Sequence, residues 1–100
     1  METAILEIKD NEFLRQFEAT IEESLVVIEY SVHPRNIFLT KLVMDEILIQ
    51  KGYDVVFMEA LFNKFKEEET KVVPTSAKIV SFFRKNRRTY KSLLPTGINI

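Results

Sequence analysis

Apolar and polar residues alternate in the first part of the chain, which is typical of β-strands. From Phe13 to Ile21 the apolar residues recur at every second position toward the end of the segment. A period of two predicts a strand with one buried face. A shorter apolar segment, Ala4–Ile8, predicts an initial strand that ends at the turn-forming residues Lys9–Asn11. The residues expected on the buried face are Phe13, Phe17, Ala19 and Ile21.

Two further strands follow at short spacing. Leu25–Val32 (LVVIEYSV) and Ile37–Met44 (IFLTKLVM) are rich in β-branched and aromatic residues, which favour strands. The polar turn Glu22–Ser24 precedes the first of them. The loop His33–Asn36, with a proline suited to a type I turn, joins the two. Consecutive strands connected by short turns predict an antiparallel meander.

The period changes to that of an α-helix in the second half of the chain. Apolar residues recur three or four positions apart from about Asp54 to Glu68, with charged residues between them. The short apolar segment Lys71–Pro74 then predicts a strand that proline ends. The apolar residues expected on the buried face of this helix are Val55, Met58, Leu61, Phe62 and Phe65.

A second helix is expected to begin after Thr75 or Ser76, either of which can cap its first turn. Its apolar side carries two adjacent phenylalanines, and it ends in the basic run Arg84–Arg88. The last apolar residues are expected to fold back onto it. The apolar residues of this C-terminal part are Ile79, Val80, Phe82, Phe83, Tyr90, Leu93 and Leu94.

The order of these elements predicts an α/β (α+β) domain with a mixed sheet of four to five strands and two helices. A strand, a helix and a second strand in succession form a β-α-β crossover, which is right-handed and makes its strands parallel. Ligands of such sheets bind beyond the carboxyl ends of the strands, where the topology switches. Here that position is the expected loop Asp45–Asp54, with the sequence QKGYD at its end.

Composition narrows the class of protein. The 100 residues suit one domain, and the formal net charge of -1 argues against a chain that binds nucleic acid or membranes through its overall charge. There is no cysteine, so disulfides and thiolate metal sites are excluded, and a single histidine, His33, cannot form a histidine-rich metal site. No apolar run is long enough to span a bilayer. We expect a cytoplasmic protein without a bound metal.

The turn around Gly52 has two interpretations. A glycine between a strand and a helix can serve only to allow a positive φ angle, or it can expose helix-terminal amides to an anion. Asp54, two residues later, is expected to cap the helix. An anion at this turn would be repelled by the same carboxylate.

The basic run in the second helix also has more than one interpretation. It can be a solvated surface, it can meet a phosphate or another anion, or, together with Phe83 and Tyr90, it can contact nucleic acid. The overall charge makes the last of these the least favoured. The basic residues concerned are Lys78, Arg84, Lys85, Arg87, Arg88 and Lys91.

The C-terminal part of the chain resembles the small, single-domain members of the GNAT acetyltransferase superfamily. These proteins have a strand ending in Val-Val-Pro, a helix with an aromatic residue followed by basic ones, then a tyrosine and a Leu-Leu pair. Val27–Tyr30 and Ile37–Val43 resemble their second and central strands, so that the resemblance covers Phe13–Pro95. The matching C-terminal residues are Lys71–Pro74, Phe82–Lys85, Tyr90, Leu93 and Leu94.

The resemblance implies an enzyme that transfers an acetyl group from acetyl-CoA to a primary amine of a small molecule or protein. Family members hold the pyrophosphate of acetyl-CoA with a loop of the pattern Arg/Gln-x-x-Gly-x-Gly/Ala. Ile49, Gly52 and Asp54 occupy its first, fourth and sixth positions, so only Gly52 matches and the loop is degenerate. The implied acetyl-CoA contacts are Leu42, Val43 and Met44 for the pantetheine, and Gln50, Lys51, Gly52, Tyr53, Asp54 and Val55 for the pyrophosphate.

Three residues are candidates for a catalytic role, each with a structural alternative. Lys41 begins the pair that stands where short relatives carry His-Thr, and Ser76 stands where they often carry a cysteine. Ser76 is equally suited to cap a helix, and Glu29 is a strand carboxylate that could serve as a general base or simply be solvated. The departures from the family pattern favour a second hypothesis, in which the domain is a non-catalytic GNAT-fold module that binds a partner.

Overall fold

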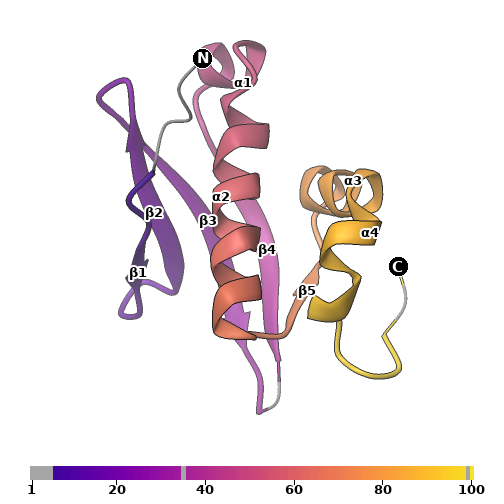
Figure 1. Cartoon of the computed structure of the whole chain (residues 1–100). Helices are drawn as coiled ribbons and strands as arrows, with labels where there is room; N and C mark the ends of the chain where they lie inside the picture. Colours follow the sequence, from indigo (N-terminus) through magenta and orange to yellow (C-terminus); the bar gives the residue numbers. More distant parts are fainter. Residues whose placement is uncertain (1–5, 35, 99) are drawn as a thin grey trace.

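The computed structural model describes residues 6–34, 36–98 and 100 and consists of one five-stranded sheet with helices against it (Figure 1). The strands are β1 (Lys9–Asn11), β2 (Gln16–Ile21), β3 (Ser24–Val32), β4 (Ile37–Val43) and β5 (Val72–Pro74). The helices are α1 (Glu46–Gln50), α2 (Tyr53–Glu68), α3 (Ala77–Lys85), α4 (Arg87–Tyr90) and the 3-10 turn η1 (Lys91–Leu93).

The sheet is mixed, with the strands in chain order. Strands β1 to β4 pair antiparallel, whereas β5 pairs parallel to β4, with Ile37 beside Val72 and Leu39 beside Pro74. Because α2 connects these two parallel strands, it forms the crossover of a β-α-β unit. The predicted meander, crossover and fold class are therefore confirmed, but the short helices α1 and α4 are present in addition to the two helices expected.

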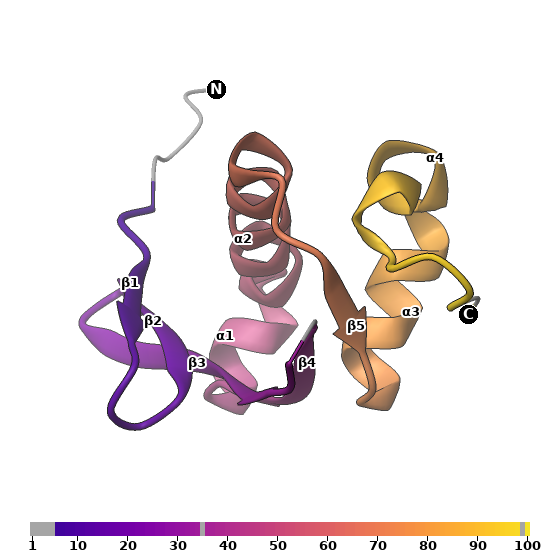
Figure 2. The ribbon, with the colours of Figure 1, turned by 90° about the horizontal axis from the view of Figure 1, so that it is seen from below.

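The core lies between the sheet and α2, and continues under α3 and α4 (Figure 2). Alternate residues of β2 and β3 point toward α2, and the ring of Phe17 meets that of Phe65 edge-on at 5.2 Å. Phe62 of α2 is fully buried and its ring also meets Phe82 of α3 and Tyr90 of α4, both at 5.3 Å. This aromatic cluster fixes the C-terminal helices against α2.

The N-terminal part differs from the sequence prediction. Lys9–Asn11, expected as a turn, forms strand β1, and no strand is formed at residues 6–8; the remainder of the predicted Ala4–Ile8 strand lies outside the described residues. The hydroxyl of Tyr30 donates to Asp10 at 2.6 Å, which helps to fix this edge strand. Phe13, expected in the core, lies in the β1–β2 turn and is 92% exposed.

The segment before the long helix is also more regular than expected. Residues 46–50, expected as part of a loop, form the short helix α1. The side chain of Leu48 in this helix is buried. Along α2, Phe57 is fully buried, whereas Val55, expected in the core, is 47% exposed. The described part of the chain contains no helix long and apolar enough to cross a membrane.

Candidate functional site

Strands β4 and β5 separate partway along their length. Their pairing ends at Leu39 and Pro74, after which the backbone N–H and the hydroxyl of Thr75 both donate to the carbonyl oxygen of Leu39, at 2.9 and 3.0 Å. Beyond this point β5 gives way to α3, while β4 continues through residues 40–43, paired only with β3 within the described structure. One backbone edge of this part of β4 is therefore free to accept a ligand.

A β-bulge lies where the two strands separate. Glu29 is paired with Lys41 and the next residue, Tyr30, with Leu39, so Thr40 is an extra residue in β4. Its hydroxyl donates to the backbone oxygen of Glu29 at 3.1 Å and holds the bulge in place. Bulges bend a strand and commonly occur next to binding sites.

The N-terminus of α2 lies at the same end of the molecule as the end of β4 (Figure 1). Gly52, with φ of 87°, precedes the first residue of α2 and allows α1 to turn into it. Among the described residues, the backbone N–H groups of Tyr53, Asp54 and Val55 have no hydrogen-bond partner. Such amides at the start of a long helix favour an anion.

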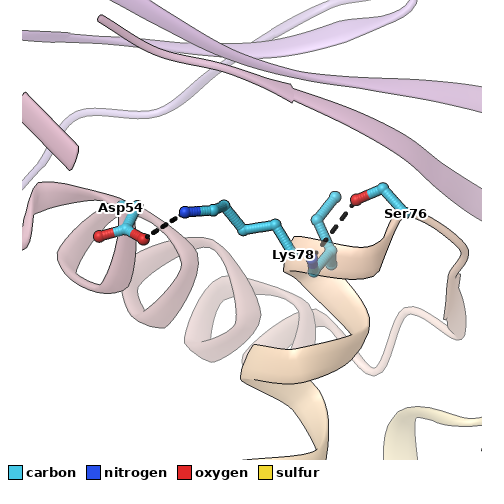
Figure 3. Close-up of polar contacts among 4 residues, drawn as sticks. Asp54, Ser76 and Lys78 are labelled. Carbon is cyan, nitrogen blue, oxygen red and sulfur yellow. Dashed lines mark hydrogen bonds and ion pairs between the residues drawn. The ribbon is translucent and has the colours of Figure 1, made fainter. Parts of the chain in front are cut away.

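Asp54 does not cap α2, contrary to the sequence prediction. It is the second residue of the helix, and neither it nor Gly52 forms a side-chain cap. Its carboxylate instead lies 3.5 Å from the Nζ of Lys78 in α3, as Figure 3 shows. The side chain of Asp54 is 14% exposed and that of Lys78 46%. This ion pair joins the first turns of α2 and α3 and balances the carboxylate charge close to the unpartnered amides.

The other polar side chains of the turn are directed toward the hairpin between β2 and β3. Lys51 forms an ion pair with Glu22 at 2.9 Å, which raises the pKa of Lys51. Hydrogen bonds from Lys51 and Tyr53 lower the pKa of Glu22. Gln50, the last residue of α1, is exposed. Lys51 is therefore engaged in a surface pair, and the backbone amides of residues 53–55 are the groups of this turn without a partner among the described residues.

The expected pantetheine contacts lie along and just beyond the free edge of β4. Leu42 and Met44 are partly buried against the core, whereas Val43 is 41% exposed. Leu42–Met44 and the turn containing Gly52 are close in sequence. The structure places both segments at the same end of the sheet (Figure 1).

The three candidate catalytic residues are separated into two locations. Glu29 and Lys41 are cross-strand neighbours on the side of the sheet that alternates with the buried, α2-facing residues. Ser76 is the N-cap of α3, and its hydroxyl accepts from the backbone N–H of Ile79 at 3.3 Å, as predicted for a cap (Figure 3). His33 hydrogen-bonds with Ser31 at 3.1 Å in the β3–β4 hairpin. A catalytic role for Glu29, Lys41 or Ser76 stays a prediction.

A small groove of about 220 Å³ between α2 and α3 adjoins the turn. Lys78, which the sequence placed only in a general basic cluster, contributes to it together with Lys85. The contact of Lys78 with Asp54 spans 24 positions of the chain, so no local pattern indicates it. The groove is lined by Asp54, Val55, Met58, Lys78, Ser81, Phe82, Lys85 and Asn86.

Comparison with solved structures identifies the architecture. An NMR solution structure of a "GCN5-like putative N-acetyltransferase" from Staphylococcus aureus superposes with a TM-score of 0.54 over 96% of this chain and 93% of that chain, at 20% sequence identity. No family model and no curated protein matches the sequence. The protein therefore has the GNAT-like fold, an α+β domain with a mixed sheet in which β4 and β5 are parallel.

Proposed function

We propose that this protein binds acetyl-CoA and transfers its acetyl group to a primary amine. The observation that supports this most strongly is the coincidence of two features at one end of the GNAT-like fold. Strands β4 and β5 separate after Leu39, and the unpartnered amides of residues 53–55 begin α2 at the same end. A free strand edge and a helix N-terminus together suit an extended ligand with an anionic group.

In this proposal the protein acts through its backbone. The free edge of β4 at residues 40–43 pairs with the amide groups of the pantetheine arm, and the amides of residues 53–55 hold the pyrophosphate. Acetyl-CoA supplies an activated thioester, whose carbonyl a backbone N–H of β4 polarises. The neutral amine attacks the thioester carbon, the C–S bond breaks with CoA leaving as the thiolate, and the proton lost by the nitrogen passes to solvent. No covalent intermediate on the protein is needed.

Asp54 determines how well this site receives an anion. A carboxylate a few ångströms from a pyrophosphate would repel it by about 1–4 kcal/mol in partly wet surroundings. The ion pair with Lys78 offsets this charge. We therefore propose that Lys78 makes the degenerate loop usable, although Asp54 stands where the family pattern has glycine or alanine.

A non-catalytic GNAT-fold module is the second candidate function. It is favoured by the arrangement of the loop side chains, because Lys51 is paired with Glu22 and Ser76 is engaged as a helix cap. Both side chains then have a partner within the described part of the protein, which accounts for them without a bound acetyl-CoA. In this case the surface around Gly52 would serve a partner rather than a reaction.

Calorimetric titration with acetyl-CoA distinguishes the two candidates. The Gly52→Asp variant places a second carboxylate at the amides and is expected to abolish binding. Gly97→Asp is a matched control, since Gly97 also has a positive φ and open space around it but lies near the C-terminus. Asp54→Asn, which removes the repelling charge with little change in shape, tests whether the loop is weakened by its carboxylate.

Each outcome has a distinct meaning. Binding by the natural sequence that is lost in Gly52→Asp and kept in Gly97→Asp supports the acetyl-CoA site, and a screen of amines for release of free CoA thiol then tests transfer. Binding that appears only in Asp54→Asn indicates a site that its own carboxylate has switched off. Absence of binding in all four proteins would overturn the proposal and favour the non-catalytic module.

A further inference from the structure

The charges of this nearly neutral chain are strongly separated along its length. Residues 71–100 contain seven of the 14 basic residues and none of the 15 acidic ones, so the remaining 70 residues carry a formal charge of -8 against +7 for the C-terminal part. In the folded domain, α3 and α4 lie on one side of the molecule, whereas β1 and β2 lie on the other (Figures 1 and 2). The net charge of -1 therefore conceals a polarised molecule.

Five basic residues lie on α3, α4 and η1, and together we call them the basic surface. All five are exposed. Within the described residues only one of them, Lys78, has an ion-pair partner. The others are available to a negatively charged ligand. The basic surface consists of Lys78, Arg84, Lys85, Arg88 and Lys91.

The local field at this surface is set by these residues rather than by the net charge. The domain measures 38 × 31 × 24 Å, whereas charges in physiological salt are screened over about 8 Å. Among the described residues, Asp54 is paired with Lys78, while burial and then the charge of Glu59 raise the pKa of Tyr90. The argument from net charge against a polyanionic ligand therefore does not hold for this side of the molecule.

The uncharged residues of the same helices restrict the kind of ligand. Phe82, Phe83 and Tyr90 are buried in the core, so these rings cannot stack on the bases of a single strand, contrary to one interpretation of the sequence. Within residues 77–93 the structure exposes no large hydrophobic side chain, such as those that anchor protein partners. A regular array of phosphates, which requires cations alone, suits this surface best.

We propose that the basic surface binds the phosphate backbone of double-stranded nucleic acid without sequence preference. The cations of α3 and those of α4 and η1 contact successive phosphates, and no base is read. This binding shares Lys78 with the acetyl-CoA site proposed above, but it does not use the amides of α2.

The test is a titration of a fluorescently labelled 20-base-pair DNA duplex, about two helical turns at ~10 base pairs per turn, with the full chain at several salt concentrations. Four or five phosphate contacts predict a slope of about -4 for the logarithm of the binding constant against that of salt. The Arg84→Gln/Arg88→Gln variant is expected to flatten this slope by about two. Lys9→Gln/Lys66→Gln, which removes the same charge from exposed positions elsewhere, is expected to leave it unchanged.

Competitors separate the alternative sources of negative charge. Saturating CoA should leave the duplex bound, and polyglutamate of equal charge should bind more weakly than the duplex. Complete displacement by CoA would assign the basic surface to the acetyl-CoA site and overturn the proposal. Equal binding of polyglutamate, equal binding of a single strand, or equal loss in both double variants would overturn it as well.

Discussion

Asp54 and Lys78 form an ion pair of 3.5 Å that connects the first turn of α2 to the first turn of α3. The two residues belong to elements that flank the point where β4 and β5 have separated. The pair therefore places a cation beside the only acidic side chain in the first turn of α2, at the helix end whose amides have no partner within residues 6–34, 36–98 and 100. The charge at this end of the molecule depends on both residues.

Replacing Lys78 by glutamine is expected to weaken acetyl-CoA binding roughly tenfold, because the carboxylate of Asp54 then faces the pyrophosphate without a counter-charge. Asp54→Asn is expected to strengthen binding by a similar factor. Calorimetry on both variants and on the double variant measures the coupling. Lys85→Gln removes a lysine from the same groove that has no ion pair with Asp54, and it should have a smaller effect. Equal effects of the two lysine substitutions would contradict a specific role for the pair.

Ser76→Ala is expected to lower the free energy of unfolding by about 1 kcal/mol. The substitution removes the hydroxyl that accepts from the N–H of Ile79 at the start of α3. Ser81→Ala, at an exposed position inside the same helix, is the control and should be neutral or slightly stabilising. Urea denaturation of both variants measures the difference. Equal stabilities would show that the cap contributes nothing.

Tyr30 is expected to make stability depend on alkaline pH. Burial, followed by its hydrogen bond to Asp10, raises the pKa of Tyr30 from 10.0 to about 12. Because the folded state holds this proton more tightly than the unfolded chain, the stabilisation is fully present below pH ~10 and is lost as pH rises toward ~12. At about 1.4 kcal/mol for each unit of pKa, the loss is about 3 kcal/mol.

Tyr30→Phe removes this contribution and should reduce the slope of the free energy of unfolding between those pH values. The raised pKa of Tyr90 leaves a remaining slope in the variant. Chemical denaturation at a series of pH values gives the comparison, and phenolate absorbance reports the ionisation itself. Superimposable pH profiles for the two proteins would show that Tyr30 ionises as easily in the folded state as in the unfolded chain.

Glu23→Gly is expected to stabilise the fold by about 0.5 kcal/mol, since glycine adopts a positive φ without the steric cost of a Cβ atom. Glu22 and Glu23, in the β2–β3 hairpin, have φ of 51° and 68°. Glu22 is left unchanged because it pairs with Lys51. The midpoint of thermal unfolding should rise, and a fall would mean that the strain at this turn is smaller than the entropy cost of glycine.

Elements in which the hydrophobic pattern repeats over many residues could be predicted from the sequence. Strands β3 and β4 and helices α2 and α3 form where the spacing of apolar residues predicts them, although Val55 is exposed, and the parallel β5 follows from the crossover. Short elements could not be predicted in this way. Lys9–Asn11 consists of turn-forming residues and becomes a strand through pairing with β2, while α1 buries a single residue, Leu48. Tertiary contacts, which local propensity does not contain, determine both.

The sequence indicates the position of the candidate site through the strand order, but it does not indicate the side-chain interactions there. The switch from antiparallel to parallel strands locates the turn at Gly52, and the cap at Ser76 follows from residue type. Asp54 is of a residue type that often caps helices, but it forms an ion pair with Lys78 instead. The sequence does not indicate this pair, because α3 brings the lysine near from a distant part of the chain. The separation of basic and acidic residues along the chain is visible in the sequence. Whether the basic residues also come together in space depends on the fold, which places α3 and α4 on one side of the molecule.

The central claim, that acetyl-CoA lies along β4 with its pyrophosphate at the start of α2, is tested most directly by mapping amide chemical shifts in an NMR titration with acetyl-CoA. The proposal predicts that the largest changes occur at the amides of residues 40–43 and 53–55. It also predicts that Gly52→Asp removes both sets of changes and that Gly97→Asp keeps them. Changes confined to α3 and α4, or none at millimolar acetyl-CoA (a concentration at the weak limit of specific binding, ~1 mM), would contradict it.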